Sequence, residues 1–206
     1  PSAGPLPSRP VWRCACGSMP QASPSPRGTG QGTPWTRGFV SAEFKPPLAG
    51  RHLQAARSAL DHADDGVKDI EAAIHAIRGG ISGHAPVQNV GCVGYCLGGR
   101  LAYMAATRTD ISASVGYYGV MIDQMLGESH AIAHPLMLHI PTADHFVGPE
   151  AQAAIHAGLG SHPKVTLHDY EGLDHGFAAE MGNRRNEAGA ALADSRTAAF
   201  FAEHLS

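Results

Sequence analysis

The sequence has few charged and few aromatic residues, and these shortages restrict the kind of protein it encodes. Of its 206 residues, 16% are charged and 6% aromatic, with a formal net charge of −3. Proteins that bind nucleic acid through its phosphates need a basic face, so we expect no nucleic-acid partner. No segment approaches the roughly 18 consecutive apolar residues of a membrane helix, so we expect no membrane partner. The hydrophobic fraction of 43% suits a globular domain with a buried core.

The first fifty residues have a single acidic side chain, no histidine and no regular hydrophobic period. No acidic residue precedes Glu43, no histidine precedes His52, and ten of the 15 prolines fall here. Closely spaced prolines prevent a continuous helix, which argues against an amphipathic targeting segment. We expect residues 1–48 to form a disordered or non-native arm rich in Pro, Ser, Gly and Arg, followed by one domain over residues 49–206.

Cysteine is scarce, and its spacing does not suit a structural zinc site. Cys14 and Cys16 lie in the arm, Cys92 and Cys96 lie far downstream, and no histidine pair completes a ligand set. We therefore expect no metal. Without an apolar signal segment, free thiols in a reducing cytoplasm are the expectation.

After residue 50 the sequence alternates between expected helices and expected strands. A helix starting at Asp64 or Asp65 has Val67, Ile70, Ile74 and Ile77 on one face, and Gly79-Gly80 can end it. Alternation of this kind predicts an α/β fold with a parallel sheet, whose loops after the strands carry the chemistry. Further helices are expected near 53–60, over 97–108, near 122–126, over 149–159 and over 186–205, the last with Leu192, Ala199, Phe200 and Phe201 on or near its apolar face. Strands are expected over 89–95, 112–118, 136–140 and 164–170.

The first expected strand ends in Gly94-Tyr95-Cys96-Leu97-Gly98, a glycine-flanked turn with a cysteine at its centre. A nucleophile on a tight strand-to-helix turn needs neighbours without bulk, and the following helix points its amino end at it. The Leu97 N–H is then a candidate oxyanion donor. A buried structural cysteine beside a glycine turn is the alternative interpretation of this segment.

Two later loops supply the other members of a candidate catalytic triad. Asp144 follows the third strand and His175 follows the fourth, which gives the nucleophile, acid and base order of α/β-hydrolases. Asp174 could compete with Asp144 as the carboxylate that orients His175, but the order and the loop favour Asp144. His145 is expected to be a surface histidine.

Taken together, these stretches resemble the dienelactone hydrolase family from about Ala63 to Leu205. The segments that carry the resemblance are Val93–Gly99, Val115–Val120, Asp144–Val147 and Asp174–Ala178. The resemblance implies an α/β-hydrolase fold and hydrolysis of small esters or lactones, as by carboxymethylenebutenolidase, without a metal or organic cofactor. It also implies that Cys96 is the nucleophile, His175 the base, Asp144 the acid and Tyr117 a substrate-pocket residue.

The sequence departs from the family's pattern on the amino-terminal side. The family's early glutamate and the loop that supplies a second oxyanion donor have no counterpart, and the amino-terminal strands of the sheet are absent. Ala179 stands where the family has a substrate-binding arginine, while the nearby Arg184 and Arg185 could attract an anionic substrate. A truncated, non-catalytic binding module is therefore the alternative to an enzyme. A monomer and a homodimer are both compatible with the sequence.

Overall fold

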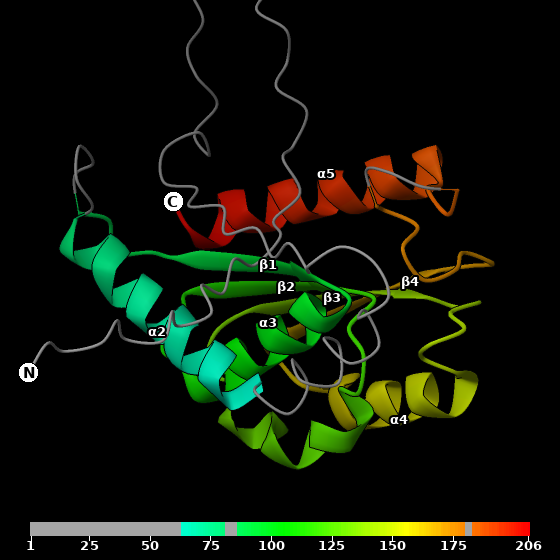
Figure 1. Cartoon of the computed structure of the whole chain (residues 1–206), viewed down its shortest axis with the longest axis horizontal. Helices are drawn as coiled ribbons and strands as arrows, with labels where there is room; N and C mark the ends of the chain where they lie inside the picture. The colour runs from blue at the N-terminus through cyan, green and yellow to red at the C-terminus, as the bar shows by residue number, and fades with distance from the viewer. Residues whose placement is uncertain (1–62, 81–85, 180–182) are drawn as a thin grey trace, which may run out of the picture.

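Four parallel strands form the centre of the computed structural model, which describes residues 63–80, 86–179 and 183–206. The arm over residues 1–48, with Cys14 and Cys16, and the helix expected near 53–60 lie outside the described residues. The strands run in the order β1-β2-β3-β4, each paired with the next in sequence (Figure 1). Their bounds are Gly91–Tyr95 for β1, Ala113–Tyr117 for β2, Leu136–Pro141 for β3 and Val165–Tyr170 for β4.

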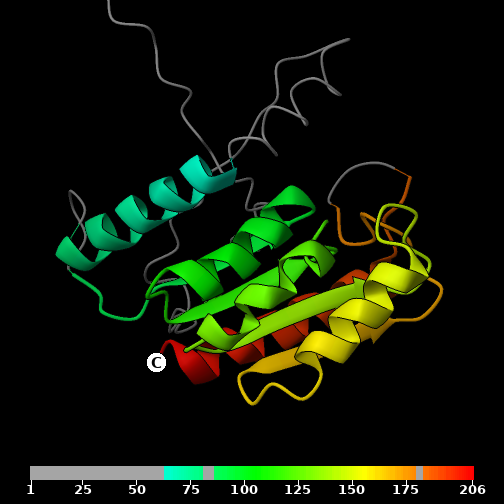
Figure 2. The same ribbon diagram turned by 90° about the horizontal axis from the view of Figure 1, so that it is seen from below.

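Helices cover both faces of this sheet, as parallel strands joined by helical crossovers require. On one face lies α5 (Glu187–His204). The other face carries α3 (Leu97–Arg108) and α4 (Pro149–Leu159), with α2 (Ala63–Gly79) packed against α3 (Figures 1 and 2). The predicted parallel α/β fold is confirmed.

Local sequence signals explain where most helices begin and end. Gly80, with a φ of 88°, follows α2, since a glycine takes this left-handed conformation without strain. Pro149 opens α4, and the Asn186 side chain caps α5 by accepting a hydrogen bond of 2.8 Å from the Gly189 N–H. The short helix expected near 122–126 is instead a 3₁₀ helix, η2, over Asp123–Ala131.

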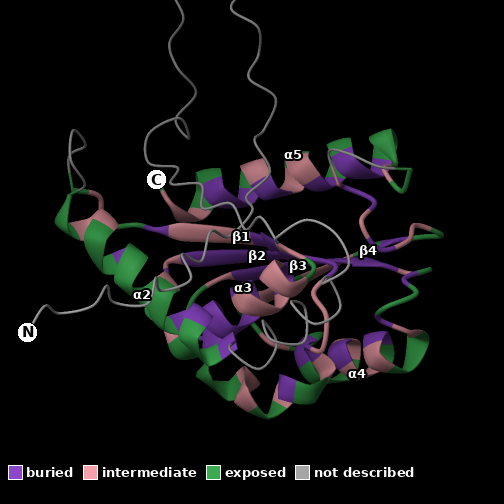
Figure 3. Cartoon of the chain, in the orientation of Figure 1, coloured by how far each residue is buried: buried purple, intermediate pink, exposed green. Residues whose placement is uncertain are grey.

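Every residue of β2 and β3 is buried, because apolar layers lie above and below these central strands (Figure 3). Phe200 and Phe201 of α5 pack onto the sheet as expected. The expectation for Leu192 and Ala199 was wrong: both are exposed, since a helix of 3.6 residues per turn that buries Phe200 and Phe201 presents Leu192 and Ala199 to solvent.

Within the described residues, β1 is an edge strand that pairs only with β2. Its neighbours on the two faces still cover it. Val93 and Tyr95 contact the cluster beneath α5, and Cys92 contacts the cluster beneath α2 and α3. Because all four strands are parallel, the carboxyl end of β1 lies on the same side of the sheet as the carboxyl ends of β3 and β4.

Candidate active site

Cys96 occupies a strained turn between β1 and α3. Its φ of 57° and ψ of −115° lie outside the regions that ordinary side chains prefer. The turn is closed so tightly that a Cβ on Gly94 would lie 1.9 Å from the carbonyl oxygen of Gly98. Glycine is thus required at position 94, and the turn presents an exposed thiol at the sheet edge.

Hydrogen bonds and close backbone contacts fix this turn in place. The Cys96 N–H donates to the Tyr117 carbonyl at 3.0 Å, and the Cys96 carbonyl accepts from the Gly99 N–H at 3.0 Å. A Cβ on Gly99 would lie 2.8 Å from the Cα of Gly119, so only glycine lets α3 approach β2 this closely. Leu97 is the first residue of α3, and its N–H has no acceptor within the helix.

Asp144 lies in the loop after β3 and is 4% exposed. Its Oδ1 accepts hydrogen bonds from the Phe146 N–H at 2.8 Å and the Val147 N–H at 3.1 Å. The buried Gln152 side chain donates to the Val147 carbonyl at 2.6 Å. These bonds hold the carboxylate rigidly, and its second oxygen stays available for a partner.

That partner is His175, in the loop after β4. His175 Nδ1 lies 2.9 Å from Asp144 Oδ2, and the imidazole is 5% exposed. Burial opposes protonation of this ring, but the hydrogen bond to Asp144 and the nearby Cys96 thiol outweigh it and raise the His175 pKa to about 9. Nε2 is buried and has no hydrogen-bond partner among the described residues. The structure therefore brings Cys96, His175 and Asp144 together.

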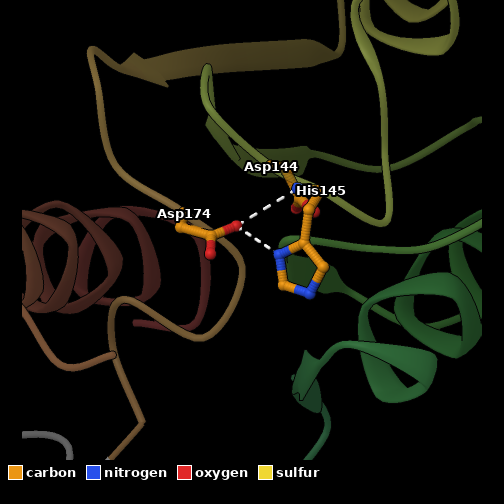
Figure 4. A group of neighbouring side chains, drawn as sticks. All are labelled: Asp144, His145 and Asp174. Carbon is orange, nitrogen blue, oxygen red and sulfur yellow. Dashed lines mark hydrogen bonds and ion pairs between the residues drawn. The ribbon is translucent and has the colours of Figure 1, made fainter. Parts of the chain in front are cut away.

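Asp174 does not orient the His175 ring. Its Oδ1 lies 2.6 Å from Nδ1 of His145, whose side chain is 42% exposed (Figure 4). Oxygen and nitrogen atoms of Asp144, His145 and Asp174 lie within 4.8 Å of one another, a distance compatible with a metal ion. The hydrogen bonds between Asp174 Oδ1 and His145 link the loop after β4 to the loop after β3.

Tyr117, the expected substrate-pocket residue, is fully buried. Its hydroxyl bonds to Thr197 Oγ1 at 2.7 Å and to Asp194 Oδ1 at 3.1 Å, both on α5. His139 joins the same network through Thr197 at 2.9 Å, and burial lowers its pKa to about 3. His139 is thus a packed core histidine.

The side chains that border the His175 ring include two that sequence reasoning did not select. The ring of Tyr118 lies 4.8 Å from it and that of Phe146 lies 4.7 Å from it. Phe146 is 61% exposed, which is unusual for a large apolar side chain. The only sequence feature that could have indicated them is their position: Tyr118 directly follows the end of β2, and Phe146 comes two residues after Asp144.

The two neighbouring arginines have different roles in the structure. Arg185 donates to the carbonyls of Ala178 and Ala179 at 3.4 Å and pairs with Glu187, so it holds its own loop. The Arg184 guanidinium lies 5.9 Å from the Phe146 ring, and within the part of the chain described it forms no ion pair. Arg184 is thus the arginine with charge available near His175.

A cysteine on a strand-to-helix turn, with a carboxylate and a histidine in the loops after later parallel strands, is the arrangement typical of the class of α/β-hydrolases. Comparison with known proteins narrows this class. Residues 48–205 match the model of the dienelactone hydrolase family, and the chain belongs to this family.

Related sequences support the assignment over part of their length. The chain is 46% identical over 121 residues to a putative carboxymethylenebutenolidase of Azospirillum brasilense, covering 59% of this chain and 52% of that protein. It is 39% identical over 139 residues to a carboxymethylenebutenolidase of Pseudomonas putida, covering 66% and 57%. The chain therefore spans little more than half the length of these relatives.

Solved structures agree on the fold. A dienelactone hydrolase-like promiscuous phosphotriesterase from metagenomic libraries superposes with a TM-score of 0.61 at 15% identity, covering 81% of this chain and 71% of that one. A putative dienelactone hydrolase of Klebsiella pneumoniae superposes with a TM-score of 0.54 at 19% identity, covering 59% and 55%. Among the described helices, none is long and apolar enough to cross a bilayer.

Proposed function

We propose that this protein hydrolyses small carboxylic esters or lactones through a Cys96-His175-Asp144 triad. The observation that carries the proposal is the buried hydrogen bond of 2.9 Å between His175 and Asp144, formed beside a cysteine on a strained turn. In this arrangement the imidazole faces the thiol through Nε2, while Nδ1 is held by a carboxylate. The chemistry needs no metal or organic cofactor.

Acylation follows from the positions of these groups. His175 Nε2 takes the thiol proton, and Cys96 Sγ attacks the carbonyl carbon of the ester. The oxyanion that develops is stabilised by the Leu97 N–H at the amino end of α3. When the tetrahedral intermediate collapses, the C–O bond to the alcohol or enol breaks, and the leaving oxygen takes the proton from His175.

Deacylation reverses the roles with water. His175 removes a proton from a water molecule, whose oxygen attacks the thioester carbon. The C–S bond breaks, the carboxylic acid leaves, and the sulfur again pairs with the His175 imidazolium. Asp144 keeps the ring in one orientation and stabilises its charge throughout. A cytoplasmic location is part of the proposal, because a thiol nucleophile needs reducing surroundings.

The test is hydrolysis of para-nitrophenyl acetate by the wild type and by Cys96→Ala. We expect the variant to lose turnover, because alanine cannot form the acyl intermediate. Cys92→Ala is the matched control, since Cys92 lies within β1, four residues before Cys96, and packs against the cluster beneath α2 and α3, with its sulfur 3.5 Å from Ser114 Oγ. Equal rates for the wild type and Cys96→Ala would contradict the proposal.

A non-catalytic binding module is the second candidate. The position of β1 at the sheet edge of the described residues favours it. Labelling with iodoacetamide at neutral pH separates the two. An enzyme of the proposed type labels faster at Cys96 than a free thiol does, because an adjacent imidazolium favours the thiolate. A binding module labels no faster.

A further inference from the structure

Two Asp-His dipeptides lie in neighbouring loops, and the aspartate of each dipeptide pairs with the histidine of the other. Asp144 and His145 lie in the loop after β3, and Asp174 and His175 lie in the loop after β4. Asp144 binds the histidine of the other loop, His175, and Asp174 in turn binds His145. The pair of Asp144 and His175 is buried, and the pair of Asp174 and His145 lies at the surface (Figure 4 shows the second pair).

A single carboxylate oxygen of Asp174 forms all the hydrogen bonds of the exposed pair. Oδ1 accepts from the His145 ring Nδ1 at 2.6 Å, from the His145 backbone N–H at 3.1 Å and from the His175 backbone N–H at 2.6 Å. The hydrogen bond from His145 is the main reason that the Asp174 pKa falls to about 2, and the backbone N–H groups of His175 and His145 add to it. The acceptor is therefore an anion at any working pH, tied to the backbone of both loops.

We infer that Asp174 and His145 form a non-catalytic dyad that positions His175 against Asp144 and Cys96. The inference rests on the proposed function. It assigns Asp174 and His145 as positioning residues, since neither touches Cys96 in the described structure. Asp174 acts on the backbone of His175, and His145 locks Asp174 in place.

The loop around His175 needs such a restraint. It contains two glycines with positive φ, Gly172 at 69° and Gly176 at 82°, so its backbone has little intrinsic preference for this path. The ring of His145 also packs 4.1 Å from the Phe146 ring, which in turn lies 4.7 Å from the His175 ring. The second dyad thus restrains His175 through its backbone and through one face of its ring.

A simple surface ion pair would give a different result. Exposed pairs contribute little to stability, and their loss leaves a distant site unchanged. A positioning dyad changes turnover, because misplacement of a catalytic group by about 1 Å can cost on the order of 100-fold in rate. The chain offers a matched control in His156 and Asp169, which pair at 3.0 Å with exposures of 40% and 48%, against 42% and 43% for His145 and Asp174.

The experiment compares kcat and KM for para-nitrophenyl acetate in the wild type, Asp174→Ala, Asp174→Asn and Asp169→Ala. We expect Asp174→Ala to lower kcat by about 10- to 100-fold with KM nearly unchanged. Asp174→Asn keeps an oxygen acceptor at the same place and should restore kcat to within about threefold. Asp169→Ala should match the wild type. A kcat for Asp174→Ala within twofold of the wild type, or an Asp174→Asn as impaired as Asp174→Ala, would overturn the inference.

A second variant keeps the test valid if Asp174→Ala fails to fold. His145→Ala leaves both backbone bonds to Asp174 and removes only the ring, so we expect a smaller loss of kcat, about 3- to 10-fold. An unchanged kcat in folded His145→Ala, with Asp174→Ala unfolded, would also overturn it. Cys96→Ala distinguishes failure of the proposed function from failure of the positioning role. Activity in Cys96→Ala would refute the proposed function. Loss of activity in Cys96→Ala, together with full activity in folded Asp174→Ala, would refute only the positioning role.

Discussion

Replacing Asp144 by asparagine removes one charge from the site while keeping its shape. The amide oxygen can still accept the hydrogen bonds from the Phe146 and Val147 N–H groups, so the loop should remain folded. The amide NH₂ group would face His175 Nδ1, where it opposes another donor. The ring then loses both its preferred tautomer and the carboxylate that stabilises its positive charge.

The structure gives the size of the effect. Burial disfavours the His175 imidazolium, yet the hydrogen bond to Asp144 and the nearby Cys96 raise its pKa from 6.5 to about 9. That rise corresponds to ~3 kcal/mol in favour of the charged ring. If Asp144 supplies most of it, Asp144→Asn should lower kcat/KM by about 100-fold. The direction of the pH dependence also follows. In the wild type the His175 imidazolium persists until the pH rises through about 9, and in the variant it should lose its proton at a lower pH.

Two measurements check this prediction. The pH dependence of kcat/KM for para-nitrophenyl acetate gives the rate effect, and NMR titration of the His175 ring gives the shift in pKa. Asp169→Asn, which changes an exposed partner of His156, serves as the control. A kcat/KM in Asp144→Asn within threefold of the wild type, or an unmoved His175 titration, would refute the assignment of Asp144.

Three further predictions concern the frame around the site. Gly94→Ala should lower the free energy of unfolding by roughly 3 kcal/mol or more, measured in urea, because its Cβ would meet the Gly98 carbonyl at 1.9 Å; a loss under about 0.5 kcal/mol would contradict the turn geometry. Tyr117→Phe should cost about 1–2 kcal/mol with kcat unchanged, since its buried hydroxyl bonds to Asp194 and Thr197 on α5; reduced kcat at unchanged stability would instead support the substrate-pocket role. For His139, whose pKa burial lowers to about 3, the unfolded chain binds a proton that the folded chain does not. Stability should fall as the pH drops from about 6.5 toward 3, and urea midpoints of a folded His139→Gln should depend less on pH over that range.

Local sequence patterns predicted the four strands well, and they predicted which strands precede Cys96, Asp144 and His175. Turn residues such as Gly94 and Pro149 act within a few residues, so their effects can be seen along the sequence. The order of nucleophile, acid and base also depends only on which strand each loop follows.

Contacts between residues far apart in the sequence determine where Tyr117, Tyr118, Asp174 and His145 lie, and the sequence alone did not predict these positions. Tyr117 and Tyr118 are adjacent, and only the pairing of Tyr117 with His139 in β3 and the packing of α5 place Tyr117 in the core. Tyr118 then turns toward His175 with a φ of 39°. The exchange between Asp174 and His145 likewise depends on two loops separated by 29 residues. Neither arrangement leaves a local pattern.

The strain at Cys96 has a consequence for which nucleophiles this site can use. Its φ of 57° is imposed by the glycine contacts of the turn and not by the sulfur. A serine would fit the same backbone, whereas the branched Cβ of threonine or valine would not. The backbone of the turn and the reactive atom are therefore separable: under the proposed mechanism, Cys96→Ser would replace a thiol nucleophile by a hydroxyl without changing the sheet, the helix or the Asp144–His175 pair.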